Sequence, residues 1–221
     1  MYGDKFAEGE ERGRWLVAWG RRKPDRQIWV AYGLIPLSYL VSYQGESAQG
    51  VLFAKEAYET TTELLGSDHP ATQTAGTGLG FNLLWSGRFE DAEPVFAQSS
   101  RLSSRFALTR LRLLQGSMDP EDALPTIEEF VAETQPIQPQ VWEVALTAQA
   151  LCLVRLGRYE DAQQVMQRHP GKFMNAIAPN HYERRLYLNT LVEIYEGLDE
   201  PEKAAEYRAL VRKAEQRDDA D

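Results

Sequence analysis

The stretch Gly87-Arg88-Phe89-Glu90-Asp91-Ala92 is repeated almost unchanged as Gly157-Arg158-Tyr159-Glu160-Asp161-Ala162, 70 residues further along the chain. Apolar residues at helical spacing precede each copy, such as Leu79 and Leu83 before the first, and others follow it. A helix, a tight turn and a second helix make an antiparallel helical hairpin. Since the separation equals two periods of about 35 residues, we predict a chain built of repeated hairpins.

Each residue type in the repeated stretch has a physical reason to be there. The glycine ends the first helix, where a positive φ is favourable only without a Cβ. The two acids lie in the first turn of the second helix, where negative charge stabilises the helix dipole. The alanine, Ala92 or Ala162, is small enough to let the two helices pack about 8–10 Å apart.

Weaker copies of the stretch extend the pattern over the chain. They begin at Gly45, Pro120 and Pro201, and their alanines are Ala48, Ala123 and Ala204. We therefore predict an all-α fold, with a single repeat domain over 1–221: a capping helix within 1–24, repeats over 25–216 and an acidic tail at 217–221. The predicted capping helix covers 4–20, and the predicted hairpins pair 25–43 with 47–65, 70–86 with 89–102, 104–115 with 120–134, 138–156 with 159–168, and 180–196 with 201–216.

Composition excludes several function classes. The 221 residues carry a net charge of -9, which argues against a nucleic-acid partner because phosphates require a basic face. The most apolar stretch, Ile28 to Val41, is too short to span a bilayer, so no membrane partner is expected. Acids at Glu8, Glu10 and Glu11 argue against a signal peptide. One cysteine, Cys152, forbids an intrachain disulfide, and we expect a cytoplasmic protein.

The seams between hairpins resemble a known family. The stretch Leu64-Leu65-Gly66-Ser67-Asp68-His69-Pro70, followed by Gly87-Arg88-Phe89-Glu90-Asp91-Ala92-Glu93-Pro94, resembles tetratricopeptide (TPR) repeats of the kinesin light chain type. The resemblance is strong over 45–102, moderate over 143–216 and weak elsewhere. The last hairpin, from Leu191 to Tyr207, is similar to TPR arrays that follow bacterial serine/threonine kinase domains. The resemblance implies a right-handed α-solenoid of about five TPR-like hairpins, which binds a protein or peptide on its concave face.

Counting within that frame gives eight candidate partner-binding residues on the concave face. Aromatic residues occupy its N-terminal half and arginines its middle, and both types dominate binding hot spots. A partner with apolar anchors and acidic residues would suit them. The alternatives are rings that pack between repeats and arginines that pair locally with Glu128, Glu129 or Glu143. The candidates are Tyr32, Tyr39, Tyr43, Phe81, Trp85, Arg105, Arg112 and Arg155.

Two positions on the predicted concave face argue against a second TPR binding mode, the carboxylate clamp. TPR domains that grip a C-terminal carboxylate use lysine and asparagine there, whereas this chain has Ile35 and Tyr39. We therefore do not expect a carboxylate clamp.

Catalytic and metal-binding patterns are weak. None of His69, His169 and His181 has a histidine, cysteine or carboxylate three or four residues away, so no metal site and no cofactor are predicted. Cys152 lies in an apolar helical run and is expected to be buried, although a Cys-His dyad stays open. The glycines of 76–80 favour close helix packing over phosphate binding.

Three functions follow, in order of preference. The first is a non-enzymatic scaffold that binds a protein or peptide. The second is a regulatory or sensor module of a larger signalling protein, which binds a peptide signal. The third is an enzyme that uses Cys152 or a pocket that the sequence does not reveal.

Overall fold

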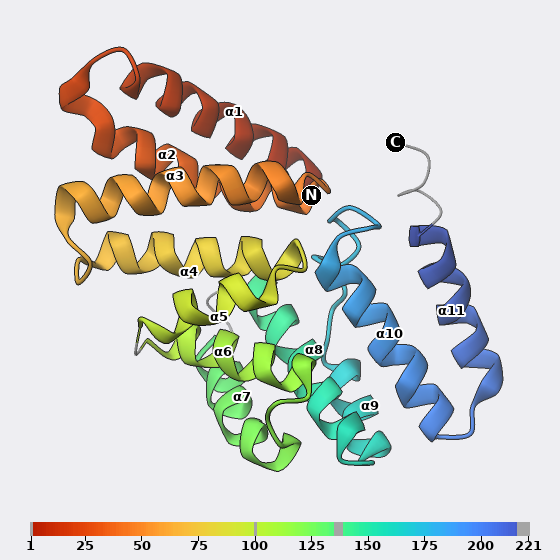
Figure 1. Ribbon diagram of the computed structural model, residues 1–221. Helices are drawn as coiled ribbons and strands as arrows, with labels where there is room; N and C mark the ends of the chain where they lie inside the picture. The colour runs from red at the N-terminus through yellow and green to blue at the C-terminus, as the bar shows by residue number, and fades with distance from the viewer. Residues whose placement is uncertain (1, 100, 135–138, 216–221) are drawn as a thin grey trace. The chain divides into compact units, whose positions relative to one another are not determined.

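The computed structural model describes residues 2–99, 101–134 and 139–215. Over these residues the protein forms eleven α-helices and one short 3-10 helix, and no strand (Figure 1). The predicted all-α fold is confirmed. The predicted acidic tail, 217–221, lies outside the described residues. None of the described helices combines the length and the apolar character that crossing a bilayer demands.

The helices follow the predicted order, with ends that differ by a few residues. The five hairpins are α2 with α3, α4 with α5, α6 with α7, α8 with α9, and α10 with α11. The elements are α1 (Tyr2–Gly20), η1 (Pro24–Arg26), α2 (Gln27–Tyr43), α3 (Ser47–Leu65), α4 (Pro70–Trp85), α5 (Phe89–Ala97), α6 (Leu102–Gln115), α7 (Pro120–Thr134), α8 (Pro139–Arg155), α9 (Tyr159–Gln167), α10 (Tyr182–Gly197) and α11 (Pro201–Glu215).

The chain forms two compact units, residues 1–104 and 105–221. In the first unit each helix from α1 to α4 packs on the next one, and α2 also contacts α4. In the second unit α7 packs on α8, α8 on α9 and α10 on α11, while α10 also contacts α8 and α9. Contact between the first helices of neighbouring hairpins is the packing expected of stacked repeats.

The turn glycines and the early alanines behave as the sequence predicts. Gly87 and Gly157 have φ values of 77° and 71°, in the left-handed region. Ala92 and Ala162 are 0% exposed, as are Ala123 and Ala204 in the weaker copies. A larger side chain at these alanines would separate the two helices of the hairpin.

Glycines inside helices create the closest approaches in the first unit. A Cβ on Gly13 of α1 would lie 2.6 Å from Cγ of Leu37 on α2, and one on Gly33 would lie 2.9 Å from Cγ2 of Val17. The α4 glycines Gly76, Gly78 and Gly80 receive ring atoms of Tyr58, Tyr39 and Phe96 respectively. The packing role predicted for the α4 glycines is therefore confirmed.

The connection between α9 and α10 contains an ordered segment that the sequence did not reveal. Phe173 and Met174 of this segment are buried, and their backbone N–H groups donate to the carboxylate of Glu143 on α8 at 3.1 and 3.3 Å. Glu143 lies 30 residues before Phe173, so no local pattern connects the two.

Candidate functional site

Four of the five predicted aromatic residues meet in one cluster on α2 and α4. The ring centroid of Trp85 lies 5.7 Å from that of Tyr39, 5.4 Å from Tyr43 and 5.7 Å from Phe81. These separations are typical of favourable aromatic pairs. We call Tyr39, Tyr43, Phe81 and Trp85 the aromatic wall. It joins the first helices of two neighbouring hairpins.

The members of the aromatic wall differ in exposure. Trp85 is only 8% exposed, whereas Tyr39, Tyr43 and Phe81 are half-buried. Trp85 therefore packs beneath the other three rings, and those three rings form the part of the aromatic wall that solvent reaches. Burial raises the pKa of Tyr39 well above its usual range, so its hydroxyl stays protonated and can both donate and accept a hydrogen bond.

A buried polar network behind the aromatic wall sets the register of α2 against α4. Ser42 Oγ donates to Asn82 Oδ1 at 2.6 Å, and Asn82 Nδ2 donates to the carbonyl of Gly78 at 2.8 Å and to Ser38 Oγ at 3.3 Å. All three polar side chains are buried, and Gly50 of α3 packs against them. Buried polar groups must be paired, so the network permits few other registers.

Tyr32, the fifth predicted aromatic residue, belongs to a different cluster. Its ring makes an edge contact with Trp29, with centroids 5.9 Å apart, and is 37% exposed. Trp29 in turn contacts Trp19 of α1. The structure therefore does not bring Tyr32 together with the aromatic wall.

The three predicted arginines all belong to the second unit. Arg105 forms an ion pair with Glu129 at 3.1 Å, as the local-pairing alternative expects, and both side chains are 49% exposed. Arg112 is half-buried on α6, and Arg155 is exposed at the end of α8. Burial raises the pKa of Glu193 on α10, and the positive charge of Arg155 opposes that shift. A groove that combines the arginines with the aromatic wall stays a prediction.

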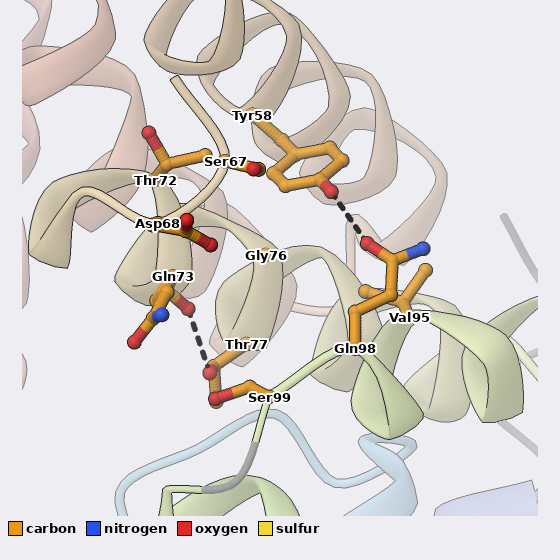
Figure 2. A pocket seen from close by; sticks show the side chains of 10 residues that line it. All are labelled: Tyr58, Ser67, Asp68, Thr72, Gln73, Gly76, Thr77, Val95, Gln98 and Ser99. Carbon is orange, nitrogen blue, oxygen red and sulfur yellow. Dashed lines mark hydrogen bonds between the residues drawn. The ribbon is translucent and has the colours of Figure 1, made fainter. Parts of the chain in front are cut away.

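A polar cleft of about 260 Å³ lies between α3, α4 and α5 (Figure 2). Tyr58 Oη donates to Gln98 Oε1 across one side at 2.7 Å, and Thr77 Oγ1 donates to the Gln73 carbonyl at 2.9 Å. The sequence did not predict this cleft, because three helices contribute to it. Its lining residues are Tyr58, Ser67, Asp68, Thr72, Gln73, Gly76, Thr77, Val95, Gln98 and Ser99.

The cleft lining is poor in groups for acid-base or nucleophilic chemistry. Among those residues Asp68 is the only carboxylate, and the lining contains no histidine or cysteine. A nucleophile needs a base within hydrogen-bond reach. The cleft is therefore suited to binding through hydroxyl and amide groups.

The three histidines have a common structural role. In each, Nδ1 accepts a hydrogen bond from the backbone N–H two residues later: Ala71 for His69, Gly171 for His169 and Glu183 for His181. His69 and His181 thereby cap the N-termini of α4 and α10. Within the described ranges no group of three or more histidine, cysteine or acidic side chains is arranged to hold a metal ion.

His169 belongs to the segment between α9 and α10, and both it and Glu143 of α8 are buried. Since His169 Nδ1 accepts a hydrogen bond, its proton is on Nε2, which lies 3.3 Å from Thr147 Oγ1. Burial lowers the pKa of His169 to about 4, so the ring is neutral at physiological pH. Burial also raises the pKa of Glu143, and the N–H donors of Phe173 and Met174 oppose that shift. These groups hold a loop in place and are closed to substrate.

Cys152 and the pair Arg110–Glu183 are buried as well. Burial raises the pKa of the Cys152 thiol to about 11, which disfavours the nucleophilic thiolate. Arg110 of α6 donates to both carboxylate oxygens of Glu183 on α10 at 2.8 and 2.6 Å, and both side chains are fully buried. The sequence did not predict this ion pair, whose members are 73 residues apart.

Comparison with solved structures agrees with the helix arrangement. A Podosopora anserina protein described by its nearly identical TPR-like repeats of kinesin light chain type matches with a TM-score of 0.51 and 16% identity, over 84% of this chain and 95% of that chain. A single-substitution variant of that protein matches with a TM-score of 0.52 and 16% identity, over 86% of this chain and 96% of the variant. The fold is that of TPR-like repeats.

The resemblance to kinesin light chain repeats is thus confirmed at the level of the fold, since 16% identity carries no more than that. The similarity of the last TPR-like hairpin to arrays that follow bacterial kinase domains stays a prediction. No family model matches the chain, and no curated protein does.

Proposed function

We propose that this chain is a non-enzymatic scaffold that binds a protein or peptide through the aromatic wall. TPR-like folds generally serve as protein-interaction scaffolds, and they bind on the face made by the first helix of each hairpin. The supporting observation is that α2 and α4, two such first helices in direct contact, place Tyr39, Tyr43 and Phe81 half-buried around Trp85.

The wall is suited to an apolar anchor of the partner. Its rings are already held by ring contacts, and the buried Asn82 network fixes the register of the two helices that carry them, so binding would cost little side-chain entropy. An acidic segment of a partner would suit Arg105, Arg112 or Arg155 of the second unit, and the protein would act in the cytoplasm. Both of these points extend the sequence predictions and are part of the proposal.

Affinity capture from the native source tests the scaffold proposal. The double variant Tyr39→Ala/Tyr43→Ala removes two half-buried rings and leaves the buried Trp85 in place. We expect it to lose at least about tenfold in affinity for the captured partner, since tyrosine is enriched among the hot-spot residues whose truncation costs about 2 kcal/mol or more.

The matched control is Leu52→Ala/Leu64→Ala, which removes two exposed apolar side chains of α3, 67% and 49% exposed. It should bind the partner like the wild type. Circular dichroism melting must show that both variants fold. Partner binding that is unchanged in the folded Tyr39→Ala/Tyr43→Ala variant would refute the role of the wall.

The polar cleft favours a second candidate, a sensor module that binds a short peptide signal. Its hydroxyl and amide lining could accept one or two polar residues of such a peptide. In this case a peptide, and not a folded protein, would raise the melting temperature. Gln98→Ala would abolish that shift, whereas Tyr39→Ala/Tyr43→Ala would not.

A further inference from the structure

The second aromatic cluster is a row of four rings on α1 and α2, of which all but Trp19 are exposed. Trp15 and Trp19 of α1 stack with centroids 6.3 Å apart, Trp19 meets Trp29 of α2 at 6.4 Å, and Trp29 meets Tyr32 at 5.9 Å. Trp15 is 65% exposed, Trp29 46% and Tyr32 37%. We call these four residues the tryptophan row. Contiguous exposed aromatic surface of this kind marks an interaction site.

Positive charge is concentrated beside the tryptophan row. The turn between α1 and α2, residues 21–26, carries four cations and one acid, although the chain as a whole has a net charge of -9. The guanidinium of Arg26 stacks over the Trp19 ring at 4.1 Å, and Arg21 forms an ion pair with Glu56 at 2.7 Å. Arg22 and Lys23 are exposed at the tip of this turn.

We propose that the tryptophan row and the adjoining cations dock the protein on an anionic lipid surface. Indole and phenol rings favour the headgroup region, where the ring is partly dehydrated and its polar edge stays wet. Lysine and arginine beside them are attracted by anionic headgroups. Acidic side chains elsewhere on the chain repel an anionic lipid surface only weakly, because charges more than about 8 Å apart are screened at physiological salt.

A lipid surface fits these side chains better than an acidic peptide does. Of the four cations beside the row, Arg21 pairs with Glu56 and Arg26 stacks over Trp19, so an acidic peptide would meet mainly Arg22 and Lys23. A membrane interface needs only protruding aromatic and basic side chains. The sequence prediction of no membrane partner depended on the lack of a spanning segment, and interfacial docking needs none.

Vesicle sedimentation tests the proposal with the full chain. We expect binding to vesicles of phosphatidylcholine with phosphatidylserine, weakening as salt is added, and little binding to phosphatidylcholine alone. Each cation near an anionic surface contributes roughly a factor of five in affinity, so Arg22→Gln/Lys23→Gln should lower binding about 25-fold. Trp15→Ala/Trp29→Ala should lower it at least tenfold and should remove the blue shift of tryptophan fluorescence on vesicles.

Two control variants match these changes in charge and in apolar area. Arg212→Gln/Lys213→Gln neutralises two exposed cations of α11, and Leu52→Ala/Leu64→Ala removes two exposed leucines of α3. Both should bind vesicles like the wild type. The proposal is overturned if the wild type ignores anionic vesicles, if the controls lose as much binding as the test variants, or if the row captures an acidic peptide and no vesicle.

Discussion

Single side chains in the first unit are held by contacts that allow little change. Gly50 is the clearest case, because a Cβ there would lie 2.0 Å from Ser42 Oγ, 2.3 Å from Asn82 Oδ1 and 2.8 Å from the Ser38 carbonyl oxygen. In an open helix position alanine would be about 1 kcal/mol more favourable than glycine. At Gly50 the steric cost exceeds that gain.

We therefore expect Gly50→Ala to lower the free energy of unfolding by about 1–3 kcal/mol, measured by urea denaturation. The double variant Gly50→Ala/Ser42→Ala removes the closest clashing atom and should recover part of the loss. A Gly50→Ala protein as stable as the wild type would show that Asn82 and Ser42 can rearrange freely.

The buried histidines make stability depend on pH. Burial lowers the pKa of His169 and of His181 to about 4, below the value near 6.5 in an unfolded chain. The unfolded state therefore takes up protons first as the pH falls. The free energy of unfolding is therefore at its full value, as far as these two rings are concerned, above about pH 6.5. It falls as the pH drops from 6.5 to 4, by on the order of 3 kcal/mol for each ring.

His181→Ser tests this because serine can still cap α10 and does not titrate. Between pH 7.5 and 5 the variant should lose less stability than the wild type, measured by urea denaturation at each pH. His69→Ser makes the same exchange at the exposed N-cap of α4, so its change in the free energy of unfolding measures the effect of replacing a histidine cap by a serine cap without a buried ring. Equal pH slopes for the wild type and His181→Ser would contradict the buried-histidine explanation.

At the scale of elements, glycine spacing decides how closely α1 lies on α2. The side chain of Leu37 fills the space over Gly13, and Val17 packs over Gly33. We expect Gly13→Val to force α1 away from α2 and to cost about 1–3 kcal/mol. Hydrogen exchange should show faster exchange in 5–20, with α3 to α5 affected less.

The control for Gly13→Val is Ala18→Val, since Ala18 lies on the exposed side of α1. It introduces the same β-branched side chain and should change the exchange of α1 by much less. Similar effects of the two substitutions would mean that helix propensity, and not packing against Leu37, controls α1.

At the scale of the whole molecule, we propose that residues 1–221 act as one repeat domain although they form two compact units. The boundary between residues 104 and 105 falls inside α6. Ser104 belongs to the first unit, where its Oγ lies 3.1 Å from Thr77 Oγ1, and Arg110 of the same helix pairs with Glu183 in the second. Because one helix belongs to both units, unfolding of either one should destabilise the other.

Glu183→Ala tests this coupling. It leaves the Arg110 charge buried without its carboxylate and should cost about 3–5 kcal/mol, whereas Arg110→Met/Glu183→Leu should cost much less. In a Trp142→Phe background all remaining tryptophans lie in the first unit. When Glu183→Ala is added to this background, we expect the urea midpoints of unfolding to fall by the same amount whether they are followed by tryptophan fluorescence or by circular dichroism. A fluorescence midpoint that Glu183→Ala does not change would mean that the units unfold as separate domains.

The sequence by itself determined the helices, the hairpin turns and the small residues between paired helices. These features depend on neighbours within about one turn of helix, which periodicity, positive-φ glycines and early alanines report directly. Cys152 also proved to be buried, as its apolar neighbours predicted.

Only the tertiary structure decided which distant side chains meet. Asn82 bonds with Ser42, which is 40 residues away in the sequence, and Glu183 pairs with Arg110, which is 73 residues away. Tyr32 belongs to the tryptophan row and not to the aromatic wall. A residue's position on its own helix fixes the direction of its side chain, but the partner it meets depends on how several helices pack. That packing follows from close contacts over the whole core, and no local stretch of the chain encodes it.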